Sequence, residues 1–313
     1  MSDDLTFGGR VAISSCLSLC AMAVDFGLLL GDEIKVIWPN VRYFDIYALV
    51  YVVTRYAGLA VQVFNIYFSL RIASGVITSP SLCKIWFRYQ AVTIQLLLAT
   101  VEVALMHRVY ALFLRNCWIL YILILLWSAQ LLSMLVSAWL VIPRVAHTET
   151  CFVKGTPAGS VYFGATTMAM NFIVLFMISW RYLHLPLTWS RGFLGYVVFR
   201  DSTLSLLTIL AFTLFLILSN TGAIQTSVNG NMVYYWLFCA MWISLGRLIV
   251  NQLKVAQGVG TNELTTEIEI ESAGVWHSDT YIDAHAVNPT GVSLSIVHYW
   301  FVFCVSHHTS LWI

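Results

Sequence analysis

The strongest constraint on this chain is a series of seven apolar stretches that follow one another almost without a break from Val11 to Val250. A membrane-spanning helix needs about 20 apolar residues, and it satisfies its own backbone polar groups. The stretches cover about Val11–Leu30, Tyr47–Leu70, Tyr89–Leu112, Trp118–Ile142, Ser160–Trp180, Ser202–Ser219 and Met232–Val250. We therefore predict an all-α integral membrane protein with seven transmembrane helices.

Composition excludes most other classes of protein. Hydrophobic residues make up 59% of the chain, charged residues only 10%, and the mean hydropathy is +0.81. A soluble domain of 313 residues could not bury so much apolar surface. The stretches do not alternate apolar and polar residues, as barrel strands would. A net charge of +1 with scattered basic residues argues against nucleic-acid binding.

The usual catalytic motifs are missing from the sequence. There is no His-Glu-x-x-His, Gly-rich phosphate loop, Gly-x-Ser-x-Gly or Cys-x-x-Cys motif. The adjacent pair His307 and His308 is too isolated to indicate a metal site. We therefore expect no enzymatic activity, no cofactor and no bound metal.

Orientation in the membrane follows from the basic residues of the loops. With the N-terminus outside, nine of them face the cytoplasm and six face the other side: Lys35, Arg42, Arg108, Arg115, Arg181, Arg191, Arg200, Arg247 and Lys254 against Arg10, Arg71, Lys84, Arg88, Arg144 and Lys154. This excess favours an outer N-terminus and a cytoplasmic C-terminus. The bilayer is then the first expected partner.

The expected organisation has three parts. A short N-terminal segment covers residues 1–10, the seven-helix domain covers 11–254, and an acidic cytoplasmic tail covers 255–313. The tail carries no Lys or Arg and is expected to be disordered. Its last part, from Val292, is apolar again. Val292-Ser293 is what a fungal-type intron donor encodes when read through in frame, so this end is either genuine or a gene-model artefact.

Of the charged residues in the apolar stretches, Asp25, Arg55 and Glu102 lie furthest from the ends of their stretches. Each costs about 2.5–3.5 kcal/mol to insert, and pairing offsets that cost. With the N-terminus outside, all three fall in the cytoplasmic half, where Asp25 or Glu102 could pair with Arg55. Two interpretations remain open. The charges form either an ionic lock or proton relay, or a static pair that fixes helix register.

Two cysteines lie outside the apolar core of the helices. Cys83 precedes the third stretch, and Cys151 lies between the fourth and fifth. Both face the outer, oxidising side in this orientation, where disulfides form. The sequence predicts a Cys83–Cys151 disulfide over the third helix, the arrangement used by seven-helix receptors, although the positions could also coincide by chance.

The inner end of the third helix carries His107, Arg108 and Tyr110. An Arg there either snorkels to lipid phosphates or acts like the Arg-containing triplet of G-protein-coupled receptors. The triplet here is His107-Arg108-Val109 and lacks an acidic neighbour. The helix-seven Asn-Pro signature of the commonest receptors is also missing. Further candidates at the inner ends of helices six and seven are Arg200, Asp201, Arg247 and Asn251.

Several of these motifs resemble a basidiomycete family of multi-pass membrane proteins that is catalogued only as a domain of unknown function. The resemblance covers about Cys16–Leu253 and is most specific in the first motif block. The motifs are Asp25–Trp38, Thr54-Arg55-Tyr56, Glu102–Leu112, Arg200-Asp201 and Arg247 with Asn251. His107 departs from the family, which has an apolar residue there. The resemblance implies the fold and the membrane location, and no activity.

Three functions fit the sequence. The leading interpretation is a receptor-like sensor of a small or lipidic ligand, with a cytoplasmic signalling protein as partner. The second is a proton-coupled transporter that uses Asp25 and Glu102 as its relay. The third is a membrane scaffold in which the charges are only structural. The ligand itself cannot be read from the sequence.

Overall fold

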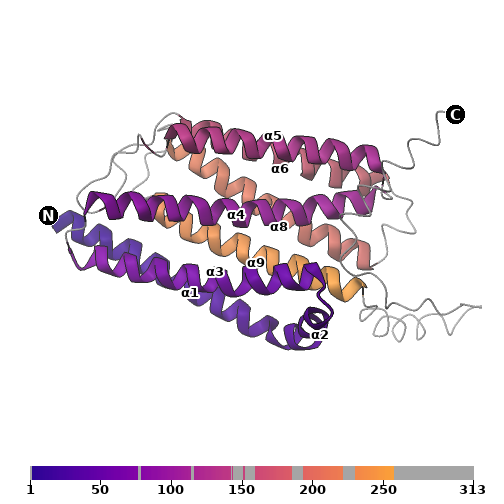
Figure 1. Ribbon diagram of the computed structural model, residues 1–313, viewed down its shortest axis with the longest axis horizontal. Helices are drawn as coiled ribbons and strands as arrows, with labels where there is room; N and C mark the ends of the chain where they lie inside the picture. The colour runs from indigo at the N-terminus through magenta and orange to yellow at the C-terminus, as the bar shows by residue number, and fades with distance from the viewer. Residues whose placement is uncertain are drawn as a thin grey trace, which may run out of the picture. The chain divides into compact units, whose positions relative to one another are not determined.

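Figure 1 shows a computed structural model of the chain, in which residues 2–76, 79–113, 116–141, 143, 151, 159–184, 193–220 and 230–256 are described. Within these ranges the chain forms helices joined by turns, without a strand. The helices are α1 (Ser2–Asp32), the π-helix η1 (Glu33–Ile37), α2 (Trp38–Arg42), α3 (Ile46–Ala73), α4 (Pro80–Leu112), α5 (Cys117–Val141), α6 (Gly159–His184), α8 (Phe193–Asn220) and α9 (Gly230–Ala256).

Six helical segments of the described chain are long and apolar enough to cross a membrane. They are Gly8–Arg42, Ile46–Ala73, Pro80–Leu112, Cys117–Val141, Phe199–Leu218 and Asn231–Lys254. The shortest has 20 residues, which at about 1.5 Å per residue spans the hydrocarbon core of a bilayer. All seven predicted stretches are helical, since α6 covers the fifth. The protein is thus an all-helical, multi-pass membrane protein.

The distribution of polar and apolar side chains supports that assignment. Large apolar side chains point outward, with Trp139 82% exposed and Leu183 77% exposed. Charged and amide side chains are buried instead, including Arg55, Asn65 and Glu102. A soluble protein has the opposite arrangement. In a bilayer the apolar exterior contacts lipid, and polar groups turn to one another inside the bundle.

The helices extend further than the apolar stretches predict. The structure begins α1 at Ser2, within the N-terminal segment expected over residues 1–10. It begins α4 at Pro80 rather than near Tyr89. Hydropathy detects only the part of a helix inside the hydrocarbon layer, whereas the helix continues through the polar interface. Pro80 suits the first turn, where its missing N–H costs nothing.

The short elements η1 and α2 are absent from the prediction. They carry charged residues that lower the hydropathy just after the first stretch, and Pro39 lies in the first turn of α2. Most of the predicted tail, residues 257–313, lies outside the described residues.

The chain divides into two compact units. One comprises residues 1–29 and 53–248, and the other comprises 30–52 and the chain from Ile249 onward. In the smaller unit Lys254 Nζ pairs with Asp32 Oδ2 at 2.8 Å. The Tyr51 hydroxyl donates to Glu33 Oε2 at 3.4 Å. The first contact joins the end of α1 to the end of α9, and the second joins η1 to α3.

In the larger unit, α6 packs against both α5 and α8, and α4 packs against α5 and α6 (Figure 1). At one end of this unit, Gly8 of α1 lies against the backbone of Ala73 at the end of α3, where an added Cβ would meet the Ala73 Cα at 3.2 Å. The N-terminal end of α1 therefore lies beside the C-terminal end of α3.

Candidate functional site

Asp25 is shared by two arginines inside the larger unit. Arg55 Nη1 on α3 lies 2.9 Å from Asp25 Oδ2, and Arg55 Nη2 also donates to the Asp25 carbonyl oxygen at 3.1 Å. Arg247 on α9 binds the other carboxylate oxygen, with Nη2 3.0 Å from Asp25 Oδ1. One carboxylate therefore joins three helices, α1, α3 and α9. We call Asp25, Arg55 and Arg247 the charge cluster.

The Arg55 guanidinium is also enclosed by aromatic rings. Its Cζ lies 3.9 Å from the centroid of the Trp242 ring on α9 and 5.5 Å from the Phe26 ring. The Trp242 indole in turn donates to the Arg55 carbonyl oxygen at 3.1 Å. A desolvated cation over an aromatic face gains about 2 kcal/mol or more. The Arg55 side chain is thus held by the Asp25 carboxylate and the Trp242 ring, and its carbonyl oxygen is held by the Trp242 indole.

Two glycines make this close approach of α3 and α9 possible. A Cβ on Gly58 would collide with the Trp242 ring, and a Cβ on Gly246 would meet Arg55 Nη1 at 2.8 Å. Larger residues at either position would push the two helices apart. Sequence pattern alone does not single out Trp242 or these glycines, because their role depends on which helix faces which.

The two arginines differ sharply in exposure. The side chains of Arg55 and Asp25 are 1% and 4% exposed, whereas that of Arg247 is 56% exposed. Arg55 is therefore the fixed partner of Asp25. Arg247 reaches the same carboxylate from outside the buried core. It can therefore dissociate from Asp25 while the buried Asp25–Arg55 ion pair remains intact.

Glu102 does not belong to the charge cluster, contrary to the predicted grouping. It lies on α4 and is 2% exposed. Its Oε1 accepts from Gln130 Nε2 on α5 at 2.6 Å and from Asn171 Nδ2 on α6 at 3.5 Å. Its Oε2 is buried without a hydrogen-bond partner among the described residues, as is Gln130 Oε1. No described cation pairs with this carboxyl group.

Arg108 at the inner end of α4 is buried rather than exposed to lipid headgroups. Its Nη1 donates to Ser202 Oγ on α8 at 2.9 Å, and its Nη2 donates to the carbonyl oxygen of Leu248 on α9. Asp201 adds a Coulombic attraction. The snorkelling interpretation is therefore wrong, because this guanidinium ties α4, α8 and α9 together from inside.

The neighbouring candidates are placed as follows. Tyr110 is buried and His107 is half-buried on α4. Arg200 pairs with the adjacent Asp201 at 3.3 Å, at a largely exposed position. Asn251 lies near the end of α9, in the smaller unit. Of these residues, Asp201 acts on the buried Arg108 through its charge.

Cys83 and Cys151 are joined in a disulfide. Beneath it lies a cluster of buried side chains contributed by α1, α3, α4 and α9: Val11, Phe68, Ile72, Trp86 and Tyr235. The Tyr235 hydroxyl lies 2.7 Å from Ser69 Oγ on α3. The disulfide thus lies at the end of the unit where α1 begins and α3 ends.

No group of three or more His, Cys, Asp or Glu side chains that could hold a metal ion is present in the described ranges. No family model, curated protein or solved structure matches this chain. The resemblance to the basidiomycete family therefore remains a prediction that depends on the motif blocks alone. What the geometry offers is a buried, shared carboxylate with one fixed and one releasable cation.

Proposed function

We propose that this chain is a seven-helix membrane sensor of receptor type, with α1, α3, α4, α5, α6, α8 and α9 as its crossings. The observation that carries the proposal is the charge cluster. Its carboxylate is held by a buried arginine on one side and by an exposed arginine on the other. A sensor needs such an element, because two states of similar energy must differ in which contacts they make.

The disulfide supports an outer N-terminus. Disulfides form in oxidising compartments and are rare in the cytosol. Val11 of α1 packs in the cluster beneath Cys83 and Cys151, so the start of α1 and the disulfide share one side of the membrane. Seven crossings then bring the end of α9 to the cytoplasmic side, in agreement with the excess of basic residues there.

Arg247 is the proposed switch. In the structure its guanidinium binds Asp25 and holds α9 against α1. Its exposed position leaves it free to exchange Asp25 for an acidic group of a cytoplasmic partner or for a lipid phosphate. The remaining Asp25–Arg55 pair keeps the buried charges neutral in both states, which avoids the several kcal/mol cost of an unpaired buried ion.

Affinity purification of the full chain from gently solubilised membranes tests this proposal. We expect to recover a heterotrimeric G-protein α subunit, and we expect Arg247→Gln to change the yield several-fold. Arg200→Gln is the matched control, since Arg200 is similarly exposed at 52% and pairs only with its neighbour. Arg108→Ala should abolish recovery of the G-protein subunit, because it removes the hydrogen bonds that join α4 to α8 and α9.

Folded protein that recovers no such subunit would contradict receptor coupling. An equal effect of Arg247→Gln and Arg200→Gln would contradict the switch and favour the scaffold alternative. Both variants are checked for an unchanged elution volume and helix content, so that a folding defect is recognised.

Glu102 favours a second candidate, a proton-coupled transporter. A buried carboxyl group without a cation in a membrane span marks a proton or ion pathway by default. Here the test is proton flux into liposomes containing the purified chain. Glu102→Gln should abolish a flux that Asp201→Asn leaves intact. A flux that survives Glu102→Gln, or no flux at all, excludes this function.

A further inference from the structure

Arg247 has hydrogen-bond donors that the charge cluster does not use. Asp25 is the only described anion that pairs with it, and that one carboxylate also pairs with Arg55. Nε and Nη2 of Arg247 both donate to Asp25 Oδ1, at 3.2 and 3.0 Å. Nη1 lies on the other side of the planar guanidinium group and makes no hydrogen bond to a described residue. Arg247 can therefore bind a second anion through Nη1.

The free side of Arg247 lies among lipid-facing side chains. Between Met241 and Val250, Arg247 is the only exposed residue of α9. On α1, Val24 and Leu28 precede and follow Asp25 and are 64% and 70% exposed. Apolar side chains so exposed form the surface that contacts the bilayer. A cation at such a surface is costly unless an anion accompanies it, so the lipid itself is the expected source of that anion.

The depth of Arg247 along α9 matches the level of lipid phosphates. It precedes Lys254, the last residue of the apolar segment Asn231–Lys254, by seven residues, or about 10 Å along the helix axis. This segment of 24 residues is about 36 Å long and slightly exceeds a hydrocarbon core of about 30 Å. Lys254 therefore lies at the interface, and the guanidinium of Arg247 can reach the headgroup boundary by snorkelling.

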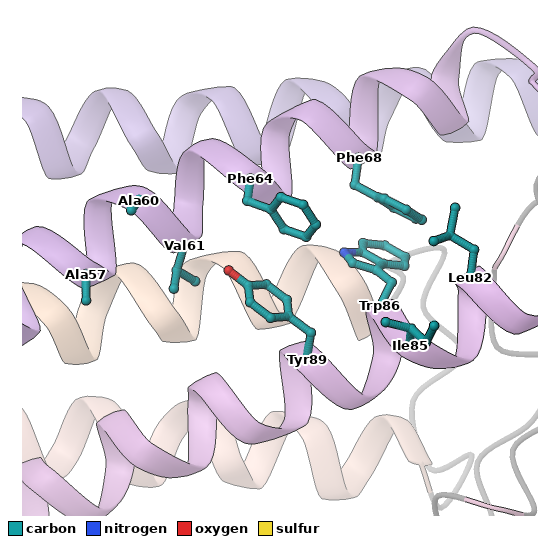
Figure 2. Close-up of a pocket in the computed structure, with 9 residues that line it drawn as sticks. All are labelled: Ala57, Ala60, Val61, Phe64, Phe68, Leu82, Ile85, Trp86 and Tyr89. Carbon is teal, nitrogen blue, oxygen red and sulfur yellow. The ribbon is translucent and has the colours of Figure 1, made fainter.

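The cavities described in the larger unit do not offer a site for an anion. Figure 2 shows aromatic and aliphatic side chains around the groove of about 500 Å³ between α3 and α4. A smaller cavity of about 120 Å³, lined from α4, α6, α8 and α9, has Thr167 and Thr213 as its polar residues. No charged side chain lines either cavity. Arg247 is thus the better candidate for binding a charged ligand.

We propose that Arg247 binds the phosphate of one anionic phospholipid of the phosphatidate type in the cytoplasmic leaflet. A phosphate oxygen first accepts a hydrogen bond from Nη1, and the phosphate then competes with Asp25 for Nε and Nη2. A terminal phosphate carries up to two negative charges, and no larger headgroup separates its oxygens from the guanidinium. The inference rests on the proposed function for the side of the membrane and for the consequence of binding, which is the release of α9 from α1.

Native mass spectrometry of the purified full chain in detergent micelles counts bound lipids, with dioleoylphosphatidate as the probe. We expect one phosphatidate per chain, and about ten-fold weaker binding of dioleoylphosphatidylcholine. Dioleoylglycerol, which lacks the phosphate, should not bind. Inorganic phosphate should not displace the lipid, because acyl chains are needed to hold the phosphate at the level of Arg247.

Two variants locate the binding. Arg247→Gln removes the charge and should weaken phosphatidate binding about ten-fold. Arg200→Gln is the matched control, because Arg200 is 52% exposed but lies at the edge of its apolar segment, next to Phe199; it should bind as the unaltered chain does. Equal binding of phosphatidylcholine, displacement by inorganic phosphate, or an equal loss in both variants would each overturn the proposal. The comparison of lipids uses the unaltered chain and does not depend on any variant folding.

Lipid binding and partner recovery are separate measurements, so the two failures can be told apart. Phosphatidate binding through Arg247 without recovery of a G-protein α subunit would contradict receptor coupling and support the lipid site. Recovery of the subunit by a chain that binds no phosphatidate would overturn the lipid site. The anion that binds Arg247 would then be an acidic group of the protein partner.

Discussion

Two carboxyl groups buried in the same helix bundle have opposite surroundings. Asp25 is held by two arginines at 2.9 and 3.0 Å, and one of these is itself covered by Trp242. Glu102 is held by two amides, from Gln130 and Asn171. Both carboxyl groups are almost fully buried. The free-energy cost of burying each carboxyl group is therefore offset by a different kind of partner, arginines for Asp25 and amides for Glu102.

The difference indicates different charge states. An ionised carboxylate in an apolar interior requires a cation, and without one it takes up a proton instead. Asp25 has two guanidinium partners. Glu102 has no cation among the described residues, and its buried Oε2 makes no hydrogen bond there. We therefore expect a protonated Glu102.

The largest effect is expected from Arg55→Met. This variant leaves Asp25 buried with only the exposed Arg247, and breaking a buried pair costs about 3–5 kcal/mol. Adding Asp25→Asn should recover much of the loss, because the double variant has no unpaired charge at this position. Thermal unfolding in detergent measures both. Losses that simply add in the double variant would show that the two residues are not coupled.

A smaller loss is expected from Glu102→Leu. It removes the acceptor of the Gln130 amide, and a buried donor left without a partner costs about 1–3 kcal/mol. The Asn171 amide keeps its hydrogen bond to the Thr167 carbonyl oxygen at 2.9 Å. The same unfolding assay measures it. Leu123→Val, a small truncation of a buried apolar side chain on α5, calibrates the scale at about 1 kcal/mol. A loss as large as that of Arg55→Met would mean that Glu102 is paired like Asp25.

Glu102→Gln should be nearly neutral. Glutamine has the shape of a protonated glutamate and keeps an acceptor oxygen for Gln130, so we expect a change below about 1 kcal/mol. Asp25→Asn is the matched comparison, because it removes the charge from the carboxylate that two arginines need. Similar losses in the two amide variants would contradict the contrast between these positions.

The smallest effect on stability is expected from Arg247→Gln, at about 0–1 kcal/mol, because the Arg247 side chain is exposed and Asp25 keeps its buried partner Arg55. Its contact with Asp25 should weaken further as salt is added. Unfolding at two salt concentrations measures this. A loss near that of Arg55→Met would make Arg247 a structural residue and would remove the basis for the switch.

Some features of the helices and of the charge cluster can be predicted from the sequence. The positions of Asp25, Arg55 and Glu102 in their stretches place all three in the same half of the membrane, which leaves either carboxyl group as a partner for Arg55 and does not choose between them. Hydropathy likewise locates seven stretches that are helical in the described residues. The helix ends are less well predicted, because α1 and α4 continue through polar residues that lower the hydropathy at Ser2 and Pro80.

The rest depends on helix rotation, which no single stretch encodes. Glu102 and Arg108 share α4 with apolar residues on every side, so the pattern does not reveal that one faces α5 and α6 while the other faces α8 and α9. Trp242 is missed for the same reason: a tryptophan on an apolar helix usually indicates packing or the interface. Glycines such as Gly58 and Gly246 are compatible with a close approach of two helices, but only the structure shows that α3 and α9 meet there.

Infrared spectroscopy of the purified protein at neutral pH tests the contrast between the two carboxyl groups most directly. A protonated carboxylic acid has a carbonyl stretching band that an ionised carboxylate lacks. The account predicts one such band that disappears in Glu102→Gln and persists in Asp25→Asn. A band that instead disappears in Asp25→Asn, or no change in Glu102→Gln, would contradict it.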